Sequence, residues 1–150
     1  MRKIFFNIIK IIRKFFYWLW NQEGSPSQRA VGFGLGIFSG CFPFFGFQTL
    51  LGIFLAKLLK ANTLLAAVGT WISNPFTYVP LYWLNYRIGS ILLTPNNNIV
   101  DLSHITTNKL WSQGWNISFR LIIGSSVVGM ISGLIAGVCL YLLFKKASTQ

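Results

Sequence analysis

The chain has 150 residues, of which 53% are hydrophobic and only 10% are charged, whereas about a quarter of the residues in a typical soluble domain are charged. Its formal net charge is +11, and Glu23 and Asp101 are its only acidic residues. The high hydrophobic content argues against intrinsic disorder, and two acids so far apart in the sequence argue against catalysis by a pair of carboxylates.

The positions of the basic residues distinguish a nucleic-acid-binding protein from a membrane protein. The first carries a basic patch over a soluble core, whereas the second carries basic residues beside its apolar spans. Here the charges flank three uncharged apolar runs, residues 30–56, 61–86 and 121–144. This pattern predicts an all-α integral membrane protein and no nucleic-acid partner.

Residues 1–24 are predicted to form a basic amphipathic helix that lies on the membrane surface. At about 100° per residue, its lysines form one stripe beside an arc of isoleucines and aromatic side chains, as in interfacial helices. The predicted contacts to anionic lipid headgroups are Lys3, Lys10, Arg13 and Lys14, each contributing roughly 1 kcal/mol. The alternative is a helix packed on the surface of another protein.

The remaining residues, 25–150, form the predicted membrane domain, which opens with Ser25 as N-cap and Pro26 in the first helical turn. Its first apolar run, residues 30–56, would be about 40 Å long as one helix and could cross a core of about 30 Å. A regular helix is not expected, because Pro43 and several glycines, including Gly46, interrupt the run near its centre.

The second apolar run, residues 61–86, has the same plan. Asn74 precedes Pro75 near its midpoint, and Asn before Pro favours a turn or a helix start. Pro43 lies 14 residues from the nearest basic residue on either side, and Pro75 lies 15 and 12 residues from its own. If the basic residues mark the membrane interfaces, both breaks lie near the bilayer midplane.

Each interrupted run carries polar side chains beside its break. An unpaired backbone N–H or C=O costs several kcal/mol in hydrocarbon, so amide and hydroxyl side chains near a break are expected to satisfy it. Paired interrupted segments are also typical of binding sites in transporters, and both interpretations stay open. The candidate midplane positions are Pro43, Gly46, Gln48, Thr49, Asn62, Thr70, Ser73, Asn74, Pro75 and Thr77.

The third apolar run follows a predicted polar loop at about residues 94–116, with some helix near Leu110 to Trp115. Residues 121–144 contain no proline and end in two lysines, which predicts one regular transmembrane helix. Its predicted helix-packing positions, Gly129, Gly133 and Gly137, recur every four residues and give a smooth face. Packing within this chain is favoured over packing against a second copy or another membrane protein.

The number of crossings decides where the termini lie. If all three runs cross, the two ends of the chain lie on opposite faces of the membrane. If one interrupted run is a re-entrant hairpin, both basic ends can be cytoplasmic, which the tendency of basic loops to face the cytoplasm favours.

Residues 25–90 contain motifs that resemble a known bacterial membrane-protein family, domain of unknown function 2062. The matching pieces are SP at residue 25, PxxGxQT at residue 43, KxN at residue 60 and GTWISNPxT at residue 69. The resemblance implies a stand-alone version of a membrane part that occurs elsewhere beside a glycosyltransferase domain. It implies no catalytic residues.

The function that we expect is therefore a non-enzymatic structural, assembly or lipid-associated factor of a bacterial cytoplasmic or internal membrane. No catalytic residue, metal site or cofactor is predicted, because Cys41, Cys139 and His104 give no ligand cluster or nucleophile–base pair. The alternative is a transporter or lipid-handling protein with a midplane site between the two broken segments.

Overall fold

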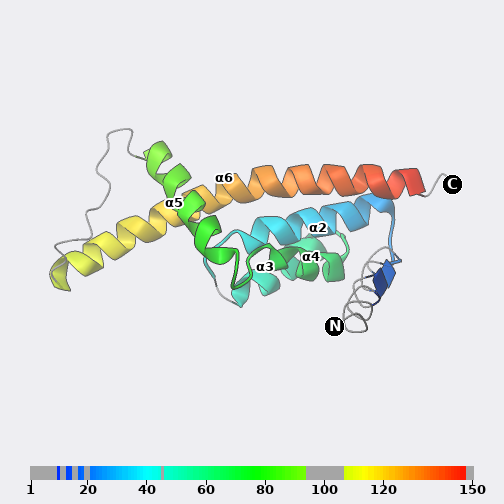
Figure 1. Cartoon of the computed structure of the whole chain (residues 1–150), viewed down its shortest axis with the longest axis horizontal. Helices are drawn as coiled ribbons and strands as arrows, with labels where there is room; N and C mark the ends of the chain where they lie inside the picture. The colour runs from blue at the N-terminus through cyan, green and yellow to red at the C-terminus, as the bar shows by residue number, and fades with distance from the viewer. Residues whose placement is uncertain are drawn as a thin grey trace, which may run out of the picture.

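The computed structural model describes residues 10, 13, 14, 17, 18, 21–44, 46–93 and 107–147, and these described residues contain helices and short connections but no β-strand. The elements are α2 (Pro26–Gly40), α3 (Phe47–Leu58), α4 (Thr63–Gly69), the 3₁₀ helix η1 (Thr70–Ile72), α5 (Tyr78–Leu93) and α6 (Thr107–Ala147). Figure 1 shows α6 along the whole length of the molecule, with α2 beside its C-terminal half and α5 crossing it. The all-α prediction is confirmed for this part of the chain.

Helix α2 begins where the sequence predicts. The backbone N–H of Gln28 donates to Ser25 Oγ at 3.2 Å, and the backbone N–H of Ser25 donates to Gln28 Oε1 at 2.9 Å. This reciprocal pair is a capping box, and Pro26 occupies the first turn, where its missing N–H has no intrahelical partner to lose.

The first apolar run forms a hairpin of two helices, α2 and α3. The break at residues 41–46 contains Pro43, and α3 begins after Gly46, whose φ of +83° is the left-handed conformation that glycine adopts readily. After α3, the backbone N–H of Asn62 donates to the carbonyl oxygen of Gln28 at 3.0 Å. The chain therefore returns to the start of α2, and the two ends of the hairpin are adjacent.

Helix α4 then runs parallel to α2 and in close contact with it. A Cβ at Gly32 would overlap the carbonyl oxygen of Asn62, and one at Gly36 would overlap that of Ala66. Further along, a Cβ at Gly40 would meet the carbonyl oxygen of Thr70 at 2.9 Å. Glycines on one face of α2 thus let two backbones approach, and they set the direction of α4.

The second apolar run is interrupted at residues 73–77, between η1 and α5. Beyond this break α5 crosses α6 in an antiparallel sense, with no room for a side chain between them. A Cβ at Gly89 would overlap the carbonyl oxygen of Arg120, and one at Gly124 would overlap that of Asn85. Both interrupted runs are thus broken where the sequence predicts.

Helix α6 is longer than the sequence suggests. Its stretch Gly114–Lys146 is, within the described residues, the one helix long and apolar enough to cross a membrane. Residues 94–106 lie outside the described residues, whereas 107–116 are helical, so the helix expected near Leu110 to Trp115 starts by Thr107 and is continuous with the final apolar helix. The stretch TNKLWSQGWN has no proline and one glycine, so nothing stops the apolar helix from extending into it.

Candidate functional site

The Asn74–Pro75 break is stabilised by its own side chains. Asn74 Oδ1 accepts the backbone N–H groups of Phe76 at 2.9 Å and Thr77 at 3.2 Å, and Asn74 Nδ2 donates to the carbonyl oxygen of Trp71 at 3.3 Å. The hydroxyl of Thr77 accepts from the backbone N–H of Asn74 at 3.0 Å. These two polar side chains therefore satisfy the backbone groups that the break releases.

The two broken runs meet at a pair of threonines. Thr49 Oγ1 and Thr70 Oγ1 are 3.0 Å apart, and Thr70 Oγ1 also donates to the carbonyl oxygen of Ala67 at 2.7 Å. Because a hydroxyl has a single proton, Thr49 is the donor to Thr70. This bond joins α3 to η1 inside the protein, where Thr70 is fully buried.

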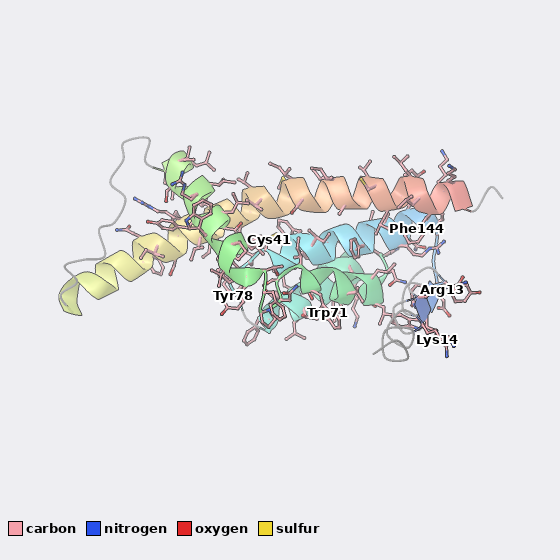
Figure 2. The ribbon with its side chains drawn as sticks, in the orientation of Figure 1. Arg13, Lys14, Cys41, Trp71, Tyr78 and Phe144 are labelled. Carbon is pink, nitrogen blue, oxygen red and sulfur yellow. The ribbon has the colours of Figure 1, made fainter. Side chains whose placement is uncertain are left out.

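A second link joins the Asn74 break to the hairpin turn. Ser73 Oγ lies 3.2 Å from the hydroxyl of Tyr82, which in turn donates to the carbonyl oxygen of Phe42 at 3.3 Å. The break of the second run is thus held beside the break of the first. In Figure 2, Cys41, at the end of α2, lies where α2, α5 and α6 meet.

A buried asparagine at this junction was not predicted from the sequence. Asn85 is 0% exposed, and its Nδ2 donates to the carbonyl oxygen of Cys41 at 2.8 Å and to Ser125 Oγ at 2.9 Å. It therefore ties α5 to both the hairpin turn and α6. The sequence feature that could have indicated this role is an asparagine inside an apolar segment, four residues before Gly89.

Two buried amide oxygens have no hydrogen-bond partner among the described residues. They are Oε1 of Gln48, whose residue is 8% exposed, and Oδ1 of Asn85. A buried polar atom without a partner is uncommon in folded proteins. Gln48 was a predicted midplane position, whereas Asn85 was not.

Asn62 lies apart from the other predicted midplane positions. Its Oδ1 caps α4 by accepting the backbone N–H of Leu65 at 2.8 Å, and its Nδ2 donates to the carbonyl oxygen of Glu23 at 2.8 Å. Because α4 starts beside the start of α2, Asn62 lies at the opposite end of α2 from both breaks. The structure therefore does not bring Asn62 together with the two breaks.

The glycine face of α6 packs against α2 of the same chain. A Cβ at Gly133 would lie 2.6 Å from the carbonyl oxygen of Gly34, and a Cβ at Gly129 would lie 2.8 Å from that of Phe38. At Gly137 the contact is looser, with the nearest atom, a carbonyl oxygen of α2, at 3.4 Å. The absence of side chains brings the two backbones together.

Basic residues gather at the end of the molecule where α2 begins and α6 ends. The guanidinium of Arg29 lies 4.5 Å from the ring centroid of Phe144, and Gln28 Nε2 donates to the carbonyl oxygen of Lys60 at 3.1 Å. These contacts place five cations at one end, and we call this region the basic end. It comprises Arg29, Lys57, Lys60, Lys145 and Lys146.

The predicted headgroup-binding cations belong to the N-terminal helix. Lys10, Arg13 and Lys14 are helical and exposed, whereas Lys3 lies outside the described residues. Figure 2 shows Arg13 and Lys14 toward the same end of the molecule as Phe144. The described part of the N-terminal helix therefore adds to the positive charge near the basic end.

A groove of about 540 Å³ runs between α2 and α6, and we call it the α2–α6 groove. Its size lies within the range of small-molecule sites in proteins. Its lining is almost entirely apolar, apart from Ser27 and Tyr141 near the basic end. No group of three or more potential metal-ligating side chains occurs among the described residues.

A comparison with protein families matches residues 9–150 to the family described as "Uncharacterized protein conserved in bacteria", domain of unknown function 2062. The chain belongs to this family. The match includes part of the basic N-terminal helix and the final span, beyond the motifs of residues 25–90. Neither the curated proteins nor the solved structures that were compared gave a match.

Membership of this family confirms the resemblance read from the sequence, and it brings no assigned activity. The GTWISNPxT motif forms η1 and the Asn74–Pro75 break, and the PxxGxQT motif forms the hairpin turn and the start of α3. The two motifs therefore correspond to the two breaks and carry the Thr49–Thr70 bond between them.

Proposed function

We propose that this chain is a non-enzymatic integral membrane protein that acts as a lipid-associated structural factor. The observation that carries the proposal is the exposure of large apolar side chains along the outer faces of the helices. Phe47 is 72% exposed, Phe76 91% and Leu134 64%. Large continuous apolar surfaces on a protein mark contact with a membrane or a partner.

The burial of α6 supports a lipid environment. A core helix of a soluble protein is covered mostly by its own chain, whereas only 17% of the most apolar window of Gly114–Lys146 is buried. Each end of this stretch also has a basic residue, Arg120 near the first and Lys145 near the last. Cations at the two ends of an apolar helix suit the two interfaces of a bilayer.

The proposal includes a definite topology. Helices α2 and α3 have 15 and 12 residues, short of the ~20 residues that a crossing needs, and their outer ends are adjacent. We infer that they form a re-entrant hairpin, that α4 to α5 crosses, and that α6 crosses back. Both ends of the described chain then lie on one side, and the tendency of basic segments to face the cytoplasm supports the cytoplasmic side.

A structural role fits how the polar side chains are used. Asn74, Thr77 and Asn85 all bond to backbone groups at the two breaks. In hydrocarbon such bonds are needed to keep the broken helices stable. The exposed cations of the N-terminal helix and of the basic end supply the surface for anionic headgroups.

The test is membrane extraction of the full chain expressed in bacteria. Washing the membranes with alkaline carbonate is expected to leave the chain in the pellet, because apolar helices hold it there rather than charge alone. Detergent is expected to release it as a folded helical protein. Recovery in the carbonate supernatant would show that the chain is peripheral, and the proposal would fail.

A solute-binding or transport function is the second candidate. It is favoured by the buried Gln48 Oε1 and Asn85 Oδ1, which have no partner among the described residues. Liposomes containing the wild-type chain and a Gln48→Leu variant test it. A solute flux that falls in the folded variant supports transport, whereas no wild-type flux argues for the structural role.

A further inference from the structure

The α2–α6 groove has a floor of backbone and walls of apolar side chains. Gly34 of α2 and Gly133 of α6 form a backbone-to-backbone contact, and neither has a side chain to fill the space above it. Leu35 of α2 and Leu134 of α6 stand on either side. The result is an open slot along the helix–helix contact.

The groove has the shape of an acyl-chain site. From Phe38 to Ser27 it follows α2 for about three turns, or roughly 16 Å at 1.5 Å per residue. A long, narrow and almost wholly apolar slot of this kind fits a single extended hydrocarbon chain. Transfer of one methylene group from water into the groove is favourable by about 0.8 kcal/mol. Within a bilayer, only the closeness of fit of the acyl chain and the headgroup can make the groove prefer one lipid over another.

The two ends of the groove differ in polarity. Phe38 and Gly129 line the end farthest from the basic end, whereas Ser27 and Tyr141 line the end nearest to it. Lys145 follows Tyr141 by four residues and is exposed, and residues four apart share a helix face. The polar mouth of the groove is therefore next to a cation on the same side of α6.

We propose that the α2–α6 groove holds one acyl chain of an anionic membrane phospholipid, with the phosphate beside Tyr141 and Lys145. The charge of the chain supports this occupant, because the whole sequence contains thirteen basic residues and only two acidic ones. A neutral lipid fills the slot equally well but has no net charge to pair with Lys145. This inference rests on the proposed membrane location and names the lipid class that the protein binds.

The test counts lipids on the detergent-purified full chain by native mass spectrometry, with equal amounts of phosphatidylglycerol and phosphatidylcholine added. One phosphatidylglycerol is expected to stay bound per chain, with phosphatidylcholine retained roughly fivefold less, the effect of one cation near an anionic lipid. Lys145→Gln is expected to abolish this preference. Lys57→Gln, which removes a cation of the basic end on α3, is expected to preserve it.

Two tryptophan variants form a matched pair for the groove itself. Leu134 lines the groove and is 64% exposed, whereas Ile135, its neighbour on α6, does not line it and is 60% exposed. Leu134→Trp is expected to fill the slot and lower phosphatidylglycerol retention about tenfold, or roughly 1.4 kcal/mol, because the acyl chain no longer fits. Ile135→Trp is expected to change nothing, and Val138→Trp is the second groove variant if Leu134→Trp fails to fold.

Equal retention of the two lipids, or equal losses in the folded groove variant and Ile135→Trp, would overturn the proposed lipid site. Either result would leave the membrane location intact as long as the chain resists carbonate extraction. Release of the chain by carbonate would instead refute the proposed function. The two failures are therefore distinguishable.

Discussion

At the scale of single residues, short polar side chains stabilise the places where helices stop. Asn74 and Thr77 bond to backbone groups within five residues, so their sequence alone predicts a turn. Asn85 differs, because its partners, Cys41 and Ser125, are 44 and 40 residues away. No local pattern could show that this asparagine joins three elements.

Replacing Asn85 with leucine is expected to destabilise the protein. The change leaves the carbonyl oxygen of Cys41 buried without its donor, at a cost of about 1–3 kcal/mol. The measurement is thermal unfolding of the purified chain in detergent, followed by circular dichroism. Asn116→Leu is the control, since Asn116 is exposed on α6 and its loss is expected to change stability by less than about 0.5 kcal/mol. Equal shifts in the two variants would contradict the role given to Asn85.

At the scale of elements, glycines determine which helices touch. α2 meets α4 through Gly32 and Gly36, and it meets α6 through Gly34. The sequence predicted a packing face on α6 from Gly129, Gly133 and Gly137 and favoured a partner within this chain, but it did not specify which helix. The tertiary structure gives α2 as that partner, because α2 carries its own glycine at the point of closest approach.

The α5–α6 crossing predicts that replacing glycine with alanine lowers the stability of the protein at one position of α6 but not at another. In Gly124→Ala the added methyl would overlap the carbonyl oxygen of Asn85, and such overpacking costs about 1–3 kcal/mol. In Gly114→Ala nothing lies within 4 Å of the new methyl, and alanine is the better helix former by about 1 kcal/mol. Unfolding temperatures in detergent should therefore fall for Gly124→Ala and rise or stay constant for Gly114→Ala; a fall of similar size in both would argue against a tight crossing.

At the scale of the whole molecule, the basic end and the hairpin determine the proposed topology. Lys60 lies beside the start of α2 through its bond to Gln28, and α6 ends near the same place because Arg29 packs on Phe144. The N-terminal half of α6 extends far beyond the hairpin (Figure 1). Hence the described part of the chain has one end with five cations, and of its helices α5 and α6 reach the other end.

Cysteine labelling tests this topology. Cys41 and Cys139 are first replaced by serine, and single cysteines are then placed at Lys60, Lys146 and Asn116. A membrane-impermeant maleimide added to intact spheroplasts is expected to label only the Asn116 variant, and all three should react after lysis. Labelling of Lys60→Cys in intact spheroplasts, with Lys146→Cys protected, would mean that the first run crosses the membrane and is not re-entrant.

The sequence by itself determined the helical content, the cap at Ser25 and both interruptions, because these depend on proline, glycine and polar side chains acting over a few residues. It also indicated the apolar character of α6, although not its full extent. Only the tertiary structure decided that the first run folds back on itself, that Asn62 lies away from the breaks, and that α2 and α6 enclose a groove. These features depend on which glycine faces meet across thirty or more residues, and the chemistry of each segment is compatible with several such pairings.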